Sequence, residues 1–130
     1  TGTSVTDRKA AAAMAKVWEH YEARGYDLED VSKANLGWDL EATSGKLTLR
    51  IEVKGLSGKV ANIELTPHEY TAFLAHALDY RLCIVTSALT APALAVCAFN
   101  LVSDNWVVES GSNLRSVAIK ERIAAQVTLA

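Results

Sequence analysis

The stretch GWDLEATSGKLTLRIEVKG, residues 37–55, predicts a β-hairpin and organises the rest of the chain around it. In its second half, four apolar side chains alternate with four polar ones: Leu47, Leu49, Ile51 and Val53 against Thr48, Arg50, Glu52 and Lys54. Alternate residues of a strand point to opposite faces, so we expect the apolar set to face a core and the polar set to face away from it. Gly45, at the first central position of the turn, favours a type II′ turn.

The turn decides which residues face each other across the hairpin. A two-residue loop of Gly45 and Lys46 would set Asp39 opposite Glu52, with Cβ atoms about 4.5–5.5 Å apart. A four-residue loop would shift the pairing by two residues and leave the two acids as diagonal neighbours on the same face. In either register both carboxylates and the Lys54 ammonium converge on one side of the hairpin. Two close carboxylates repel each other unless a cation lies between them, and oxygen-only ligands suit magnesium or manganese.

Asp39 followed by Glu52-Val53-Lys54 resembles the D…ExK signature of the PD-(D/E)xK nuclease superfamily. The wider pattern resembles one branch of that superfamily, the NO VEIN C-terminal-like domain family, whose function is unknown. E-x-K alone is a common and weak pattern, but the ordered set of segments is fairly specific. The resembling segments lie between residue 7 and about residue 90: Tyr21–Tyr26, Asp30–Ser32, Gly37–Leu40, Ile51–Gly55, Leu65–Thr66, Glu69–Tyr70 and Tyr80–Val85.

The resemblance implies a Mg²⁺-dependent endonuclease, with Mn²⁺ as a substitute, that hydrolyses DNA within a restriction, defence or DNA-processing protein. It implies that Asp39, Glu52 and the backbone carbonyl of Val53 hold the metal ion. Lys54 would orient the attacking water or stabilise the transition state. The family often has a further acidic residue early in the first helix, near Lys9, and this chain has none there. That departure bears on whether a second metal ion binds.

The composition is that of a globular protein with a real core. The chain has 130 residues, half of them apolar, and 13 basic against 15 acidic residues give a net charge of −2. A slightly negative net charge is not typical of a protein that binds DNA through charge alone. We therefore expect one nuclease-like domain over residues 1–130, excised from a longer protein whose other domains supply part of the DNA affinity.

The sequence also bears on the compartment and the partners. It shows neither a signal peptide nor an apolar run long enough to span a bilayer, so no membrane is expected among the partners. Cys83 and Cys97 lie in apolar runs without zinc-ligand spacing, which favours buried reduced thiols and a cytoplasmic location over a disulfide. DNA and the other domains of the longer protein are the expected partners. The oligomeric state, a homodimer included, stays open.

Helical periodicity predicts a first helix over Asp7–Arg24, closed by Gly25 in a left-handed conformation. Its apolar stripe is expected to consist of Ala10, Met14, Val17, Trp18 and Tyr21. Glu22 lies roughly 80° from the centre of the stripe and Glu19 roughly 140° away, on a wheel of about 100° per residue. An acid at the edge of the stripe can reach round towards the sheet, so Glu22 is the better candidate for a site acid. The alternative for Glu22 is an ordinary solvated helix charge.

A second helix begins at the sequence Thr66-Pro67-His68-Glu69, which is a capping box with proline at the first helical position. We expect this helix to run to about Asp79. Because the cap accounts for Glu69, the pattern does not place that residue in the site. The expected strands outside the hairpin are Tyr26–Ser32, Val60–Thr66, a central strand in Arg81–Leu89, Ala93–Phe99, Trp106–Glu109 and Ser116–Ile119, the last followed by a helical turn.

These elements predict an α/β fold with a mixed central sheet flanked by helices. Their order agrees with the restriction-endonuclease-like αβββαβ core that the resemblance implies. The expected core residues are Trp38, Ile51, Val53, Ile63, Leu65, Phe73, Leu74, Ile84 and Val85. Two alternatives to an endonuclease remain open. The domain could be a catalytically inactive nuclease-fold module for DNA binding, sensing or protein interaction, which the acidic net charge favours. The polar side chains of the hairpin could also be an exposed strand face whose ion pairs contribute little.

Overall fold

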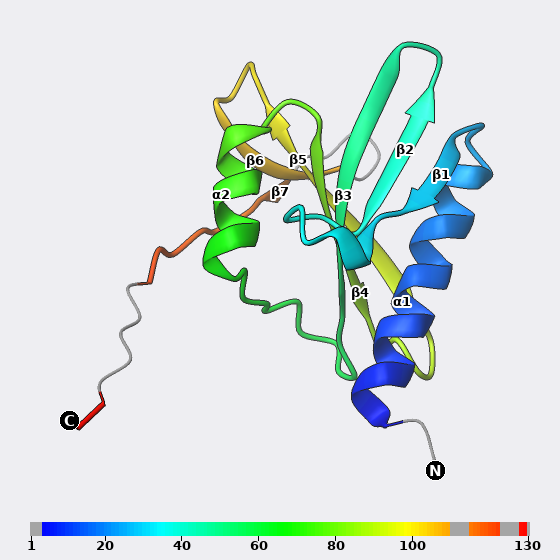
Figure 1. The fold of residues 1–130 in the computed structure, drawn as a ribbon, viewed down its shortest axis with the longest axis vertical. Helices are drawn as coiled ribbons and strands as arrows, with labels where there is room; N and C mark the ends of the chain where they lie inside the picture. Colours follow the sequence, from blue (N-terminus) through cyan, green and yellow to red (C-terminus); the bar gives the residue numbers. More distant parts are fainter. Residues whose placement is uncertain (1–3, 110–114, 123–127, 130) are drawn as a thin grey trace.

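A computed structural model of the chain describes residues 4–109, 115–122 and 128–129 (Figure 1). Its elements in chain order are α1 (Val5–Glu22), β1 (Asp27–Asp30), the 3₁₀ turn η1 (Ser32–Ala34), β2 (Leu40–Ser44), β3 (Leu47–Gly55), α2 (Pro67–Ala75), β4 (Tyr80–Thr86), β5 (Ala93–Asn100), β6 (Asn105–Glu109) and β7 (Arg115–Ser116). Within the described residues, no helix is both long and apolar enough to cross a membrane.

One seven-stranded sheet runs through the molecule, with its strands in sequence order from β1 to β7. All neighbouring strands are antiparallel except β3 and β4, which are parallel. Parallel neighbours cannot be joined by a tight turn, so residues 56–79, which include α2, form the crossover between them. The resulting order α1-β1-β2-β3-α2-β4 confirms the predicted mixed sheet with an αβββαβ core.

The two α-helices cover opposite faces of the sheet. Cys83 and Val85 of β4 belong to the core cluster that contains residues of α1, whereas Leu82 and Ile84 belong to the cluster that contains residues of α2. Figure 1 shows the sheet between the two helices. Strand β4 is therefore buried on both faces, as its continuous apolar run predicts.

Helix α1 begins after Ser4, whose side chain accepts a hydrogen bond from the Asp7 amide. After the helix, Gly25 has a φ of 84° and fits the left-handed position that the sequence predicts for it. The buried face of the helix consists of Ala13, Val17 and Tyr21. Ala10, which the sequence places in the stripe, is exposed, so the buried face is rotated from the predicted one.

The hairpin has the two-residue loop, because Ser44 pairs with Leu47 and Leu40 pairs with Ile51. Gly45 has a φ of 62° and Lys46 has a negative φ, as a type II′ turn requires. This register confirms the shorter of the two loops that the sequence allows.

The polar side of β3 does not face away from the core as the alternation predicts, and this expectation is wrong. Arg50, Glu52 and Lys54 alternate with Ile51, which packs in the cluster of α1, so they lie on the face that α2 covers. There they neighbour the β4 residues Tyr80, Leu82 and Ile84, which belong to the cluster of α2. The cause is the crossover, because a helix that joins two parallel strands must pack against one face of the sheet.

The expected strand over Val60–Thr66 is also wrong, since these residues form no strand. β3 already pairs with β2 on one edge and β4 on the other, so no edge is open to a further strand. Ile63 and Leu65 are still half-buried and pack against the cluster of α2. The segment keeps its apolar contacts while serving as part of the crossover.

Helix α2 is shorter than predicted and ends at Ala75 instead of Asp79. Its buried residues are Ala72 and Phe73, and Leu74, which the sequence places in the core, is 53% exposed. Stacking of the Phe73 ring on Trp106, with centroids 3.8 Å apart, sets the rotation of this short helix. Strand β7 is likewise shorter than the predicted Ser116–Ile119, and the expected helical turn falls partly on residues 123–127, outside the described residues.

The core assignment predicts a large loss of stability for one substitution and almost no change for another. Ile84→Ala should lower the free energy of unfolding by about 2–5 kcal/mol, because it removes a buried side chain and leaves a cavity. Leu74→Ala should change it by less than about 0.5 kcal/mol, since that side chain is exposed. Denaturant unfolding measures both. A loss below about 1 kcal/mol for Ile84→Ala would show that β4 is not the central strand.

Candidate functional site

Asp39 lies directly before β2 and places its carboxylate against the backbone of β3. Its amide donates to the Ile51 carbonyl at 2.8 Å, and its Oδ2 accepts from the Val53 amide at 2.9 Å. The registered pairs of the hairpin end at Leu40 with Ile51, so no backbone carbonyl of β2 remains for the Val53 amide. The Asp39 side chain supplies the partner that this amide needs and is thereby held where the strand pairing stops.

Glu52 places a carboxyl group in the interior. It is 3% exposed and is the only charged residue that is buried in the described part of the chain. Burial raises the pKa of Glu52 to about 10, and the negative charges of Asp39 and Glu69 add to this, against the opposing effect of Lys54. Burial also raises the pKa of Asp39, although the hydrogen bond from the Val53 amide opposes the rise. The Glu52 carboxyl therefore keeps its proton at neutral pH when no cation is bound.

Lys54 and Glu69 complete the group of charges. The Lys54 Nζ lies 2.8 Å from Glu69 Oε1 and 3.8 Å from Glu52 Oε2. Glu69 Oε1 also accepts from the Thr66 amide at 2.9 Å, which closes the predicted capping box. The pKa of Glu69 is lowered, because hydrogen bonds from Lys54 and Thr66 outweigh the opposing effect of burial. The capping-box pattern alone does not predict Glu69 in the site, although Glu69-Tyr70 is among the segments of the family resemblance.

Tyr80 anchors the loop that leads into Asp39. Its buried hydroxyl donates to the Gly37 carbonyl at 2.8 Å. Burial raises the pKa of Tyr80, and the charges of the site acids add to the rise, so the hydroxyl remains a donor. Gly37 has a φ of 98°, and a Cβ there would lie 2.7 Å from the Cβ of Ala72 on α2. A glycine is therefore required where this loop passes α2.

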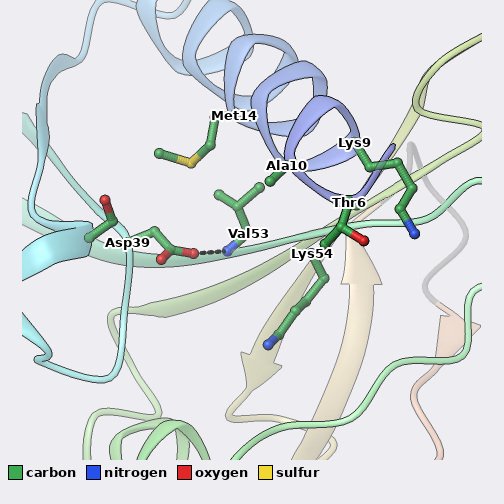
Figure 2. A pocket seen from close by; sticks show the side chains of 9 residues that line it. Thr6, Lys9, Ala10, Met14, Asp39, Val53 and Lys54 are labelled. Carbon is green, nitrogen blue, oxygen red and sulfur yellow. Dashed lines mark hydrogen bonds between the residues drawn. The ribbon is translucent and has the colours of Figure 1, made fainter. Parts of the chain in front are cut away.

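A cavity of about 320 Å³ lies between the first half of α1 and β3 (Figure 2). Its polar lining residues are Thr6, Lys9, Ser32, Asp39 and Lys54. Figure 2 shows Asp39 and Lys9 on opposite sides of the cavity, and the Lys54 side chain directed away from α1. A Cβ at Gly55 would lie 2.7 Å from the Lys9 carbonyl oxygen and 2.9 Å from the Ala13 Cβ, so glycine allows α1 to approach β3 this closely.

The structure brings Asp39, Glu52 and Lys54 together, but it does not place Glu22 in this site. The Glu22 carboxylate accepts from the Trp18 ring nitrogen at 3.2 Å on the exposed side of α1. The α1 residues that line the cavity end at Met14, eight residues before Glu22, which is about 12 Å along a helix. The wheel angle describes only the direction of a side chain around the helix and not its position along the axis.

The donor set fits a hard divalent cation. Asp39 and Glu52 are within hydrogen-bonding reach of each other, and burial together with the charge of Asp39 raises the pKa of Glu52, so two negative charges there are costly. A divalent ion would remove that cost, and carboxylate oxygens are the ligands that Mg²⁺ and Mn²⁺ prefer. No group of three or more His, Cys, Asp or Glu side chains among the described residues is arranged to hold a metal ion. The remaining ligands would therefore be backbone oxygens and water.

The fold and the site define the class of this protein as an α/β domain with an αβββαβ core, in which the buried carboxyl group of Glu52 on β3 lies near that of Asp39, directly before β2. The family model described as "Protein NO VEIN, C-terminal" matches residues 9–97, and the chain belongs to this family. The match includes Asp39, Glu52, Lys54 and Glu69, and it confirms the family named from the sequence. Neither a search of the curated proteins nor a search of the solved structures found a match.

The raised pKa of Glu52 predicts a dependence of stability on pH. The unfolded chain loses this proton near pH 4.5, whereas the folded protein keeps it up to about pH 10, so stability falls as pH rises between these values. Glu52→Gln cannot ionise. It should therefore be more stable than the wild type in EDTA, by a margin that grows from pH 5 to pH 9 with a slope of at most about 1.4 kcal/mol per pH unit.

Urea unfolding at each pH measures this margin. Glu29→Gln removes a carboxylate from an exposed position in β1 and controls for the loss of one negative charge. A margin that stays constant with pH would show that Glu52 is already ionised at neutral pH in the folded protein.

Proposed function

We propose that this chain is a phosphodiesterase that hydrolyses DNA with the help of Mg²⁺, or of Mn²⁺ in its place. The observation that supports the proposal most is the pair of Asp39 and Glu52, two carboxyl groups forced together next to Lys54. A structural role alone would favour an apolar residue at position 52, because a buried carboxyl group beside another acid destabilises the fold. Membership of the NO VEIN C-terminal family and the nuclease-like core agree with the proposal.

Each residue has a role that follows from its position. Asp39 and Glu52 would hold the cation, with the backbone carbonyl of Val53 as a further oxygen ligand. When bound, such a cation lowers the pKa of a water ligand and neutralises charge on the phosphate. Lys54 supplies a fixed positive charge two residues after Glu52 and stabilises the negative charge that develops on the phosphoryl oxygens. Thr6 and Lys9, across the cavity from Asp39, offer a hydroxyl and an ammonium to a neighbouring phosphate of the DNA strand.

Two observations favour the catalytically inactive alternative. The α1 residues that line the cavity are Thr6, Lys9, Ala10 and Met14, and none of them is an acid. The cavity therefore offers no carboxylate from the helix for a second cation. With a net charge of −2, the chain also has little general attraction for DNA. A module that binds DNA without cutting it would show an affinity that does not depend on Mg²⁺.

Three substitutions separate the roles in this site. Asp39→Ala and Glu52→Ala should lose metal affinity and cleavage together, because each removes a ligand. Lys54→Ala should keep metal binding, or tighten it, since a positive neighbour has gone. Its cleavage should nevertheless fall by about 10²–10³, the usual effect of losing one preorganised electrostatic group.

Calorimetry with Mn²⁺ and a nicking assay on supercoiled plasmid measure the two properties. Lys16→Ala, on α1 but outside the cavity, is the control for the loss of a lysine and should nick normally. If Lys54→Ala nicks as fast as the wild type, Lys54 has no catalytic role. If the wild type binds DNA but never nicks it with either metal, the enzyme proposal fails and the binding module replaces it.

A further inference from the structure

Glu69 lies closer to Lys54 than Glu52 does. The Lys54 Nζ is 2.8 Å from Glu69 Oε1, a hydrogen-bonded ion pair, but 3.8 Å from Glu52 Oε2. We propose that Glu69 is a positioning residue that holds the Lys54 ammonium away from Glu52, so that Glu52 remains available to a divalent cation. This inference rests on the proposed function, because it concerns the same site.

Glu69 can hold the lysine because it is itself fixed to the backbone. Its Oε1 accepts from the Thr66 amide at 2.9 Å, and its own amide donates to the Thr66 hydroxyl at 3.2 Å. Both bonds belong to the capping box of α2, and the first of them ties the carboxylate to the start of that helix. One oxygen thus accepts from the helix cap and from Lys54. A carboxylate anchored in this way cannot follow the lysine towards β3.

The lysine would otherwise compete with the cation. Lys54 follows Glu52 by two residues on the same strand and therefore projects from the same face. The Glu52 side chain is 4% exposed and the Lys54 side chain 22% exposed, so little water competes for a contact between the ammonium and this carboxyl group. Without the charge of Glu69, the ammonium is expected to close onto Glu52. Lys54 would then occupy the Glu52 oxygen that a divalent cation needs.

Two single substitutions separate this role from the capping role. Glu69→Gln keeps an oxygen for the cap, since glutamine also forms capping boxes, but loses the negative charge. Thr66→Ala removes the capping hydroxyl, which binds only the Glu69 amide, and keeps the backbone amide that binds the Glu69 carboxylate, so the Glu69–Lys54 ion pair remains. Lys54→Met keeps a long side chain without the charge and serves as the second background. Thermal unfolding of every variant checks that it is folded before metal affinity is measured.

The test is a double-mutant cycle on Mn²⁺ affinity, measured by calorimetry. Glu69→Gln should weaken binding about tenfold when Lys54 is present. In the Lys54→Met background it should weaken binding by no more than about threefold, because only the direct loss of a nearby charge remains. Thr66→Ala should lower the melting temperature and leave the affinity unchanged. Equal losses from Glu69→Gln in the two backgrounds would overturn the inference.

The outcomes for the inference and for the proposed function can be told apart. If the wild type binds Mn²⁺ without cleaving DNA, the proposed function fails and the cycle still decides the role of Glu69. If the wild type binds no Mn²⁺, the crystal structure of metal-free Glu69→Gln decides it. The inference expects Lys54 Nζ within hydrogen-bonding distance of Glu52 in that structure. A lysine that stays beside position 69, about as far from Glu52 as before, overturns it.

Discussion

The carboxyl group of Glu52 lies beneath α2, where water cannot solvate a negative charge. The carboxyl group of Asp39 lies within hydrogen-bonding reach of it. The surrounding structure keeps both groups in this costly arrangement. The Val53 amide binds Asp39, Tyr80 fixes the loop before Asp39, and the cap of α2 orients Glu69 and with it Lys54. Each of these contacts comes from a different element, so the site exists only when the crossover through α2 is complete.

The crossover also explains how the two faces of β3 can differ, with an apolar core on one face and a polar site on the other. On one side of β3, Ile51 packs into the cluster that α1 covers. On the other side, Glu52 and Lys54 replace the apolar residues that would normally lie under a helix. The capping box of α2 compensates for the partly buried charge of Lys54, because its acid, Glu69, forms an ion pair with that lysine. The helix therefore shields the site and contributes to its electrostatics with the same residue, Glu69.

Local patterns in the sequence predict much of this structure, since their physical causes are local. The type II′ turn at Gly45, the cap at Thr66 and the continuous apolar run of β4 each determine their own conformation. Asp39, Glu52 and Lys54 could also be grouped from the register of the hairpin. The errors concern contacts between distant segments. Alternation cannot tell whether a polar strand face lies under a helix, and so it did not predict that Glu52 is buried.

The same limit explains the other misplaced residues. Val60–Thr66 has the composition of a strand, but the parallel pairing of β3 with β4 leaves it no open edge. Glu22 has a suitable direction on the helix wheel, yet the cavity lies beside the opposite half of α1. Glu69 has a complete local explanation in the capping box, and only the tertiary contact with Lys54 shows its second partner. In each case the missing information is the position of one element relative to another.

The proposed site requires that Asp39 and Glu52 share a divalent cation. Crystals of the wild type soaked in MnCl₂, with diffraction measured at the manganese absorption edge, test it most directly. A shared cation should give an anomalous peak between the two carboxylates, about 2.1–2.2 Å from an oxygen of each, as for a hard octahedral ion. A well-diffracting soak with no peak there, or with manganese only at other carboxylates, would contradict it.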